Sequence, residues 1–153
     1  MKRLWLGVVL VGLLAAALGT GQASADSCKL DGLWYGFNTF GEDFPMTITK
    51  TGGGHYTAVV INPNTSAQGE FVFKRQGEYE TTWLTYVDGE PFGYPGQWLA
   101  VYMTGDVEMT SCDNWSAATV WDVYEFTPGT GQDPFANPPV DSIPVSLFYT
   151  RMP

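Results

Sequence analysis

The sequence has few of the residues on which metal binding and nucleophilic catalysis depend. Its 153 residues include only two cysteines and one histidine. Cys28, Cys112 and His55 are far apart, without zinc-ligand spacing, and no C-x-x-C redox motif is present. His55 follows three glycines, which predicts a solvated turn residue rather than a catalytic base. We therefore expect neither a metal nor a cofactor.

Basic residues are also scarce. The chain has seven lysines and arginines against 16 aspartates and glutamates, a net charge of −9. Nucleic acids and anionic lipid surfaces both attract proteins through lysine and arginine. The charge therefore argues against a nucleic-acid partner and against docking on a membrane. Adjacent acids such as Glu42 and Asp43 are expected to lie in solvated turns.

A long apolar run occurs only at the N-terminus. Two basic residues precede an apolar stretch over residues 4–18, and Ala23-Ser24-Ala25 has the small-x-small pattern of a cleavage site. We predict a signal peptide over residues 1–25 and one mature domain over residues 26–153. Since two basic residues leave with the signal peptide, the mature part has a net charge of −11. Such a protein is expected to be secreted or periplasmic.

The two cysteines fit this prediction of export. In an oxidising compartment, Cys28 and Cys112 most simply form a disulfide. The bond would close a loop that spans most of the mature chain.

The mature part shows the pattern of a β protein. Apolar residues do not recur with helical spacing, and short β-rich runs alternate with glycine, proline, asparagine and aspartate. This pattern predicts an all-β fold, either a sandwich or a barrel. The expected strands cover residues 33–37, 45–50, 56–61, 70–74, 80–87, 97–103, 117–126 and 145–151.

Residues 127–144 interrupt this rhythm with five prolines. Proline lacks the N–H that a central strand needs, so the segment is expected to be a long connection. It would be either a mobile surface loop or a lid over a binding site.

Both ends of the mature chain resemble a known superfamily. Residues 28–34 read C-x-L-x-G-x-W, and residues 148–151 on the last predicted strand end in arginine. An early G-x-W with a basic residue on the final strand resembles the calycins, which include lipocalins and avidins. The resemblance implies an eight-stranded antiparallel up-and-down β-barrel. It also implies that Arg151 lies across Trp34 in a cation–π contact that closes one end.

Two further features resemble the avidins in particular. Cys28 stands just before the first strand, and residues 116–121 read Ser-Ala-Ala-Thr-Val-Trp. This resemblance implies a biotin-like ligand, held by polar residues near the G-x-W and walled by tryptophans. It also implies a homo-oligomer in which a neighbouring subunit donates an aromatic residue. Gly36 replaces the asparagine that avidins carry after the G-x-W. The predicted ligand-binding residues are Asn38, Thr39, Tyr56, Trp98, Thr119, Trp121 and Phe135.

Strand alternation places Trp98 and Tyr102 on one face of a strand, and Thr119 and Trp121 on one face of another. If these faces line the interior, they suit a flat apolar ligand with polar ends. An eight-stranded barrel either holds one small ligand or is filled by its own side chains.

Four functions remain open at this point. The first is non-enzymatic binding of a small molecule in the barrel, with biotin as first candidate. The second is a lipocalin-like carrier of an apolar metabolite. The third is a filled barrel that serves as an envelope protein or inhibitor through residues 127–144. The fourth is a small cyclase-like enzyme, which needs a carboxylate such as Asp122 or Glu125 inside the barrel with a raised pKa.

Overall fold

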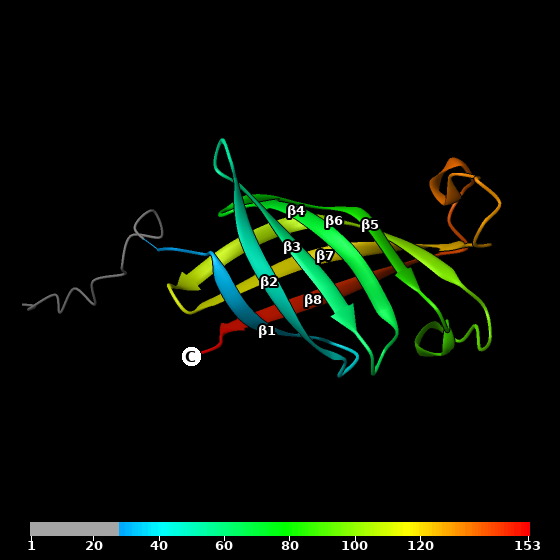
Figure 1. Ribbon diagram of the computed structural model, residues 1–153, viewed down its shortest axis with the longest axis horizontal. Coiled ribbons are helices and arrows are strands. Elements are labelled where there is room, and N and C mark those ends of the chain that lie inside the picture. The colour runs from blue at the N-terminus through cyan, green and yellow to red at the C-terminus, as the bar shows by residue number, and fades with distance from the viewer. Residues whose placement is uncertain (1–27) are drawn as a thin grey trace, which may run out of the picture.

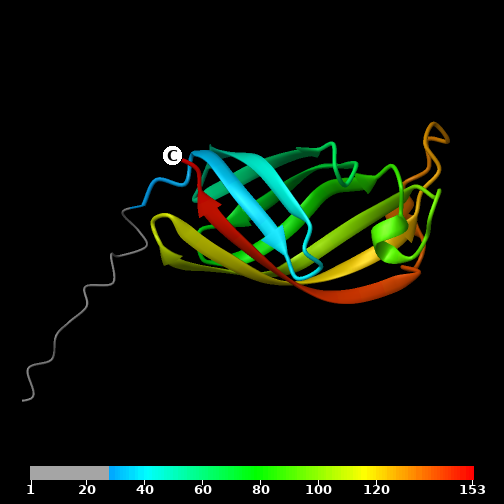
Figure 2. The same ribbon diagram turned by 90° about the horizontal axis from the view of Figure 1, so that it is seen from below.

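The computed structural model describes residues 28–153, and the predicted signal peptide lies outside the described residues. The described chain forms a closed barrel in which eight antiparallel strands follow one another in sequence order. The last strand returns to pair with the first (Figures 1 and 2). The prediction of an all-β, eight-stranded up-and-down barrel is therefore confirmed.

The strands account for most of the described chain. Within residues 28–153 no helix is long and apolar enough to cross a membrane. Two short 3-10 turns, η2 (Glu90–Phe92) and η3 (Pro134–Ala136), lie in connections between strands. The strands are β1 (Gly32–Asn38), β2 (Asp43–Gly52), β3 (His55–Asn62), β4 (Ala67–Lys74), β5 (Gly77–Tyr86), β6 (Leu99–Ser111), β7 (Asn114–Glu125) and β8 (Asp141–Arg151).

All eight strands are longer than the sequence predicts, and the difference has most effect in β6 and β8. β6 runs for 13 residues, and β8 begins at Asp141, so the connection before β8 is shorter than predicted. Pro144 lies inside β8, opposite Val120 of β7. The β1–β8 pairing reaches only from Arg151 to Leu147, so β7 is the sole strand neighbour around Pro144. An edge position of this kind tolerates a residue without an N–H.

The side chains alternate between the inside and the outside of the barrel, as a strand requires. In β3, Tyr56, Ala58, Val60 and Asn62 are buried, and the residues between them are partly or fully exposed. The other strands follow the same rule, so the interior is mainly apolar and aromatic. The buried polar residues of the described chain are Asn38, Asn62, Thr81 and Thr119.

One end of the barrel is sealed by the contact that the G-x-W pattern implies. Trp34 is fully buried, and its indole Nε1 donates to the carbonyl of Leu30 at 2.8 Å. The Arg151 guanidinium carbon lies 4.6 Å from the Trp34 ring centroid. Arg151 also donates to the carbonyl of Lys29 and pairs with Asp113 at 3.2 Å. Because Trp34 and Arg151 are register partners on β1 and β8, this contact joins the first strand to the last.

Stacked aromatic rings fill the barrel beside this seal. The Trp115 ring lies 3.6 Å from the Tyr149 ring and 4.9 Å from the Phe73 ring, measured between centroids. Phe73 in turn stacks on Tyr56 at 5.7 Å. This half of the interior is a packed core, because the rings occupy the volume that a ligand would need.

The predicted disulfide is confirmed. Cys28 and Cys112 are bonded, and 84 positions of sequence separate them. The bond ties the segment before β1 to the β6–β7 hairpin at the sealed end.

Replacing both cysteines by serine, Cys28→Ser with Cys112→Ser, is expected to lower the free energy of unfolding by about 4 kcal/mol. The reason is that the unfolded chain regains the freedom that closure of a long loop removes. Urea unfolding of the variant and the oxidised parent measures the difference. Equal stability of the two proteins would contradict a bonded pair at this position.

Candidate functional site

The end opposite Trp34 is built from connections rather than strands. Because the strands alternate in direction, four connections meet there: residues 39–42, 63–66, 87–98 and 126–140. The two longest lie at the end of the barrel away from the C-terminus (Figures 1 and 2). This end is called the mouth below.

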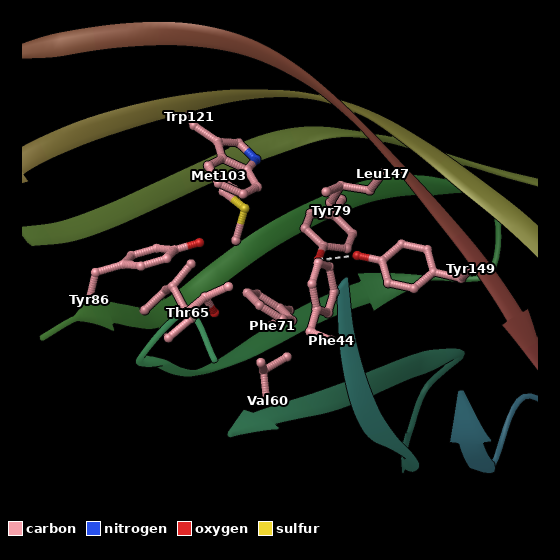
Figure 3. Close-up of a pocket in the computed structure, with 12 residues that line it drawn as sticks. Phe44, Val60, Thr65, Phe71, Tyr79, Tyr86, Met103, Trp121, Leu147 and Tyr149 are labelled. Atoms are coloured by element: carbon pink, nitrogen blue, oxygen red, sulfur yellow. Dashed lines mark hydrogen bonds between the residues drawn. The ribbon is translucent and has the colours of Figure 1, made fainter. Parts of the chain in front are cut away.

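A small cavity lies inside the barrel between the packed core and the mouth. The volume that the centre of a water molecule can occupy there is about 10 Å³, which is room for about one water. Side chains from many strands converge on it (Figure 3). The lining is apolar and aromatic except for the hydroxyl groups of Thr65, Tyr79, Tyr86 and Tyr149. The interior is therefore nearly filled, and this small volume lies on its mouth side.

Two of these hydroxyl groups satisfy one another. The Oη atoms of Tyr79 and Tyr149 are 3.1 Å apart, and one donates to the other (Figure 3). Burial raises the pKa of both phenols, so both remain neutral near pH 7. This closed polar pair needs no ligand.

A fixed indole forms another part of the cavity wall. Trp121 Nε1 donates to Thr119 Oγ1 at 2.9 Å, and Thr119 Oγ1 donates to the carbonyl of Val145 at 2.8 Å. Both side chains are buried. Thr119 therefore orients Trp121, and its hydroxyl is engaged in both of these hydrogen bonds.

Two aromatic rings from the connections pack on this wall. Phe92 of η2 lies 4.9 Å from the Tyr86 ring and 6.0 Å from the Trp121 ring. Phe40, in the β1–β2 turn, lies 6.3 Å from the Trp121 ring and is half exposed. Both rings belong to connections, so a change in their position breaks no strand pairing.

A carboxylate with an unused oxygen lies beside the same residues. Glu42 Oε2 accepts hydrogen bonds from Asn38 Nδ2 at 2.6 Å and from Tyr86 Oη at 3.4 Å. Glu42 Oε1 is buried and has no hydrogen-bond partner within residues 28–153. Such an orphaned acceptor is rare, because leaving it unpaired costs about 1–3 kcal/mol. What this site lacks is a hydrogen-bond donor.

The surroundings of Glu42 and Tyr86 raise the pKa of both side chains. Burial raises the pKa of the Glu42 carboxyl, and the bonds from Asn38 and Tyr86 oppose that rise. Burial also raises the pKa of Tyr86, and the charge of Glu42 raises it further. Tyr86 is therefore a neutral donor near pH 7.

Asn38 explains why Glu42 points inward from a turn. Its Oδ1 accepts from the backbone N–H of Phe40 at 3.0 Å and of Glu42 at 3.1 Å, which closes the turn. Its Nδ2 holds the Glu42 carboxylate. The amide of Asn38 is thus fully engaged in positioning Glu42.

The structure brings together only some of the predicted ligand-binding residues. Trp121 lines the cavity, and Thr119 lies behind it, bonded to Trp121 Nε1. Asn38 is linked to the cavity through Glu42, which accepts from the lining residue Tyr86. Tyr56 is buried inside the barrel but at the sealed end, where its hydroxyl accepts from Arg75 at 3.1 Å. The ligand-contact roles of these residues stay predictions.

Trp98 is not part of the interior wall, and this corrects the prediction. It precedes β6, is 38% exposed and packs on Phe126. β6 turns Leu99, Val101 and Met103 inward, so Trp98 falls on the outer face. Successive residues of a strand point to opposite faces, so the sequence leaves two possible inner faces for β6. The aromatic residues of the strand favoured the face that lies outside.

Phe135 and Thr39 also lie away from the cavity of their own barrel. Phe135 packs outside on Tyr124 at 5.1 Å and on Tyr102 at 5.8 Å. Residues 126–140 therefore lean on the outer wall of β6 and β7 instead of covering the mouth as a lid. Thr39 is exposed in the β1–β2 turn.

The carboxylates named for a cyclase-like enzyme are outside as well. Glu125 is exposed, and Asp122 is partly exposed and accepts from Ser142. The prediction that Glu42 is a solvated turn acid is wrong, because the Asn38 turn directs its side chain inward. Asn38 four residues before Glu42, at the end of a strand, is the sequence signal that could have shown this. No signal of that kind marks Tyr86 or Phe92.

Comparison of the chain with protein-family models and with curated proteins finds no match. The resemblance to calycins and avidins therefore stays a prediction, as do export, homo-oligomer formation and a biotin-like ligand. What the structure adds is an aromatic cavity and a carboxylate that is bonded to one of its lining residues, Tyr86, and has a second, buried oxygen without a donor.

Glu42→Gln is expected to raise the free energy of unfolding near pH 7 by about 1 kcal/mol. The change removes a charge that burial disfavours and keeps an acceptor for Asn38. Because the folded state raises the pKa of Glu42, the cost of this carboxyl is absent below the ordinary glutamate pKa. It appears as pH rises through the folded pKa.

Urea unfolding at about pH 7 and about pH 3.5, on either side of the ordinary glutamate pKa, measures this effect. The gain in stability should be present at the higher pH and absent at the lower. The exposed Glu125→Gln serves as the matched control and should show no gain. An equal gain at both pH values would contradict a buried charge at Glu42.

Proposed function

We propose that the protein is an exported, non-enzymatic barrel that binds a small molecule at its mouth. The site is bounded by Glu42, Tyr86, Phe92 and Trp121. The observation that carries the proposal is Glu42 Oε1, a buried acceptor without a donor. The same carboxylate accepts from Tyr86, which lines the aromatic cavity. A ligand with an N–H or O–H group supplies the missing donor and covers the aromatic wall.

The ligand enters where the Phe92 ring now lies. The cavity holds about one water, so a larger molecule needs space that a side chain now occupies. Phe92 comes from a loop and packs its ring against Tyr86 and Trp121. A six-membered ring therefore fits this position, and the Phe92 ring stands in for the apolar part of a ligand. Outward rotation of Phe92 opens the site at the cost of these contacts.

The resemblance to avidins supports biotin as the first ligand to test. Its ureido ring carries two N–H donors, and Glu42 Oε1 is an acceptor. The apolar lining supports the alternative of a lipocalin-like carrier of an apolar metabolite. The packed core around Trp115 limits either ligand to the mouth side of the interior.

A second candidate, a small cyclase-like enzyme, is supported by one observation. Glu42 has a raised pKa beside the neutral phenol of Tyr86, which are properties of an acid–base pair. Incubation with a ligand that binds, followed by mass analysis of the ligand, separates the two functions. The binding protein returns the ligand unchanged, and the enzyme returns an isomer or product.

Thermal unfolding with added ligand tests the proposal, with biotin first and then retinoids, fatty acids and sterols. A ligand that binds only the folded state raises the free energy of unfolding by about 2.7 kcal/mol when its concentration is a hundredfold above its Kd. Phe92→Ala is expected to tighten binding, because it removes the ring that competes with the ligand.

Trp83→Ala is the matched control, since Trp83 is exposed on the outer face of β5. It should leave the ligand shift unchanged. A ligand that binds the parent and the Phe92→Ala variant equally would place its site away from the mouth and contradict the proposal.

A further inference from the structure

The basic residues of the described chain gather at the sealed end of the barrel. They lie before β1, in or next to the β2–β3 and β4–β5 hairpins, and at the end of β8. His55 lies in the same half, at the start of β3. The five basic residues are Lys29, Lys50, Lys74, Arg75 and Arg151.

The mouth, in contrast, carries only acids among its charged residues. The four connections that form it, residues 39–42, 63–66, 87–98 and 126–140, contain no lysine, arginine or histidine. Acids lie in these connections and in the strand ends next to them. They are Glu42, Asp43, Asp88, Glu90, Asp122, Glu125, Asp133 and Asp141.

This separation of charge acts on any ligand that approaches the mouth. Charges of one sign around a low-dielectric opening raise the local concentration of the opposite sign and speed its association. A cation is therefore drawn toward Glu42, and an anion is repelled.

The walls of the site favour the same charge. The faces of tryptophan, tyrosine and phenylalanine rings attract cations, and tryptophan does so most strongly. Trp121 and Tyr86 line the cavity and Phe40 packs on Trp121, so three such rings remain when the Phe92 ring moves out. Glu42 Oε1 adds an acceptor that is strongest toward a charged N–H donor.

A metal ion does not satisfy these features. Within residues 28–153 no group of three or more histidine, cysteine, aspartate or glutamate residues comes together as metal ligands. Aromatic rings are also poor neighbours for a hydrated metal ion, whereas they suit an organic cation.

We propose that the ligand of the mouth is an organic ammonium ion with an apolar or aromatic body. Its N–H group donates to Glu42 Oε1, and its body replaces the Phe92 ring against Tyr86 and Trp121. This inference rests on the proposed function, because it names the ligand class for the same site. It also explains why a carboxylate is kept where burial disfavours its charge.

Calorimetric titration of the mature protein near pH 7 tests the inference with four small probes that share a phenyl ring. 2-Phenylethylammonium has charge and N–H donors, and 2-phenylethanol is its neutral counterpart. The N-trimethylated ammonium keeps the charge without the donors, and 3-phenylpropanoate is an anion. We expect the ammonium to bind at least about tenfold more tightly than the alcohol. The trimethylated ion should be intermediate, and the anion weakest.

Glu42→Gln is expected to weaken binding of the ammonium at least about tenfold and of the alcohol less than about twofold. Glu108→Gln is the matched control, since it removes an exposed acid from the sealed-end part of β6, away from Glu42. It should change either affinity less than about twofold at physiological salt, where exposed charges are screened. Near-ultraviolet circular dichroism shows whether each variant keeps the fold of the parent.

The outcomes separate this inference from the proposed function. If the ammonium and the alcohol bind equally and Phe92→Ala tightens both, the inference that the ligand is a cation is overturned. The proposed site at the mouth then remains. A preference for the ammonium that survives Glu42→Gln overturns the role of Glu42. Absence of binding by all four probes and by the ligands of the earlier titration contradicts both proposals.

Discussion

The pairing of β1 with β8 is the constraint on which the rest of the structure depends. Trp34 and Arg151 are register partners in this pairing, and the guanidinium covers the indole at 4.6 Å. Without closure, both strands would be open edges and the inner faces would be exposed to water. With closure, alternate residues of every strand share one interior, and the chain acquires a sealed end and a mouth. The Cys28–Cys112 bond strengthens the sealed end.

The small interior of an eight-stranded barrel then determines where chemistry can occur. The rings of Trp115, Tyr149 and Phe73 take the sealed half, and their packing stabilises the fold. The mouth half keeps a small free volume, and two rings from the connections pack on its wall. In that half Asn38 turns Glu42 inward and leaves one carboxylate oxygen without a donor. A stability cost retained at an opening is typical of a binding site.

The fold could be predicted because its signals are local. Strand alternation and glycine turns act within a few residues, and they predict an all-β sandwich or barrel. The choice of a closed barrel comes from the resemblance carried by the early G-x-W and the final arginine. The face of a strand is less certain, because a shift of one residue reverses it, and Trp98 therefore fell on the wrong side. Phe92 could not be identified from its own segment, and for Glu42 the only local signal was Asn38. Their burial depends on Tyr86 and Trp121, which only the closed barrel brings beside them.

The central claim is that the carboxylate of Glu42 accepts a hydrogen bond from a cationic ligand at the mouth. Carbon-13 NMR of the Glu42 carboxyl, titrated with pH in the absence and presence of 2-phenylethylammonium, tests it most directly. The account predicts that the pKa of Glu42 lies above the ordinary glutamate value in the free protein, because of burial. Saturating ammonium should lower it, because the cation stabilises the ionised form. A pKa that the ammonium leaves unchanged, in a protein that binds it, would contradict the account.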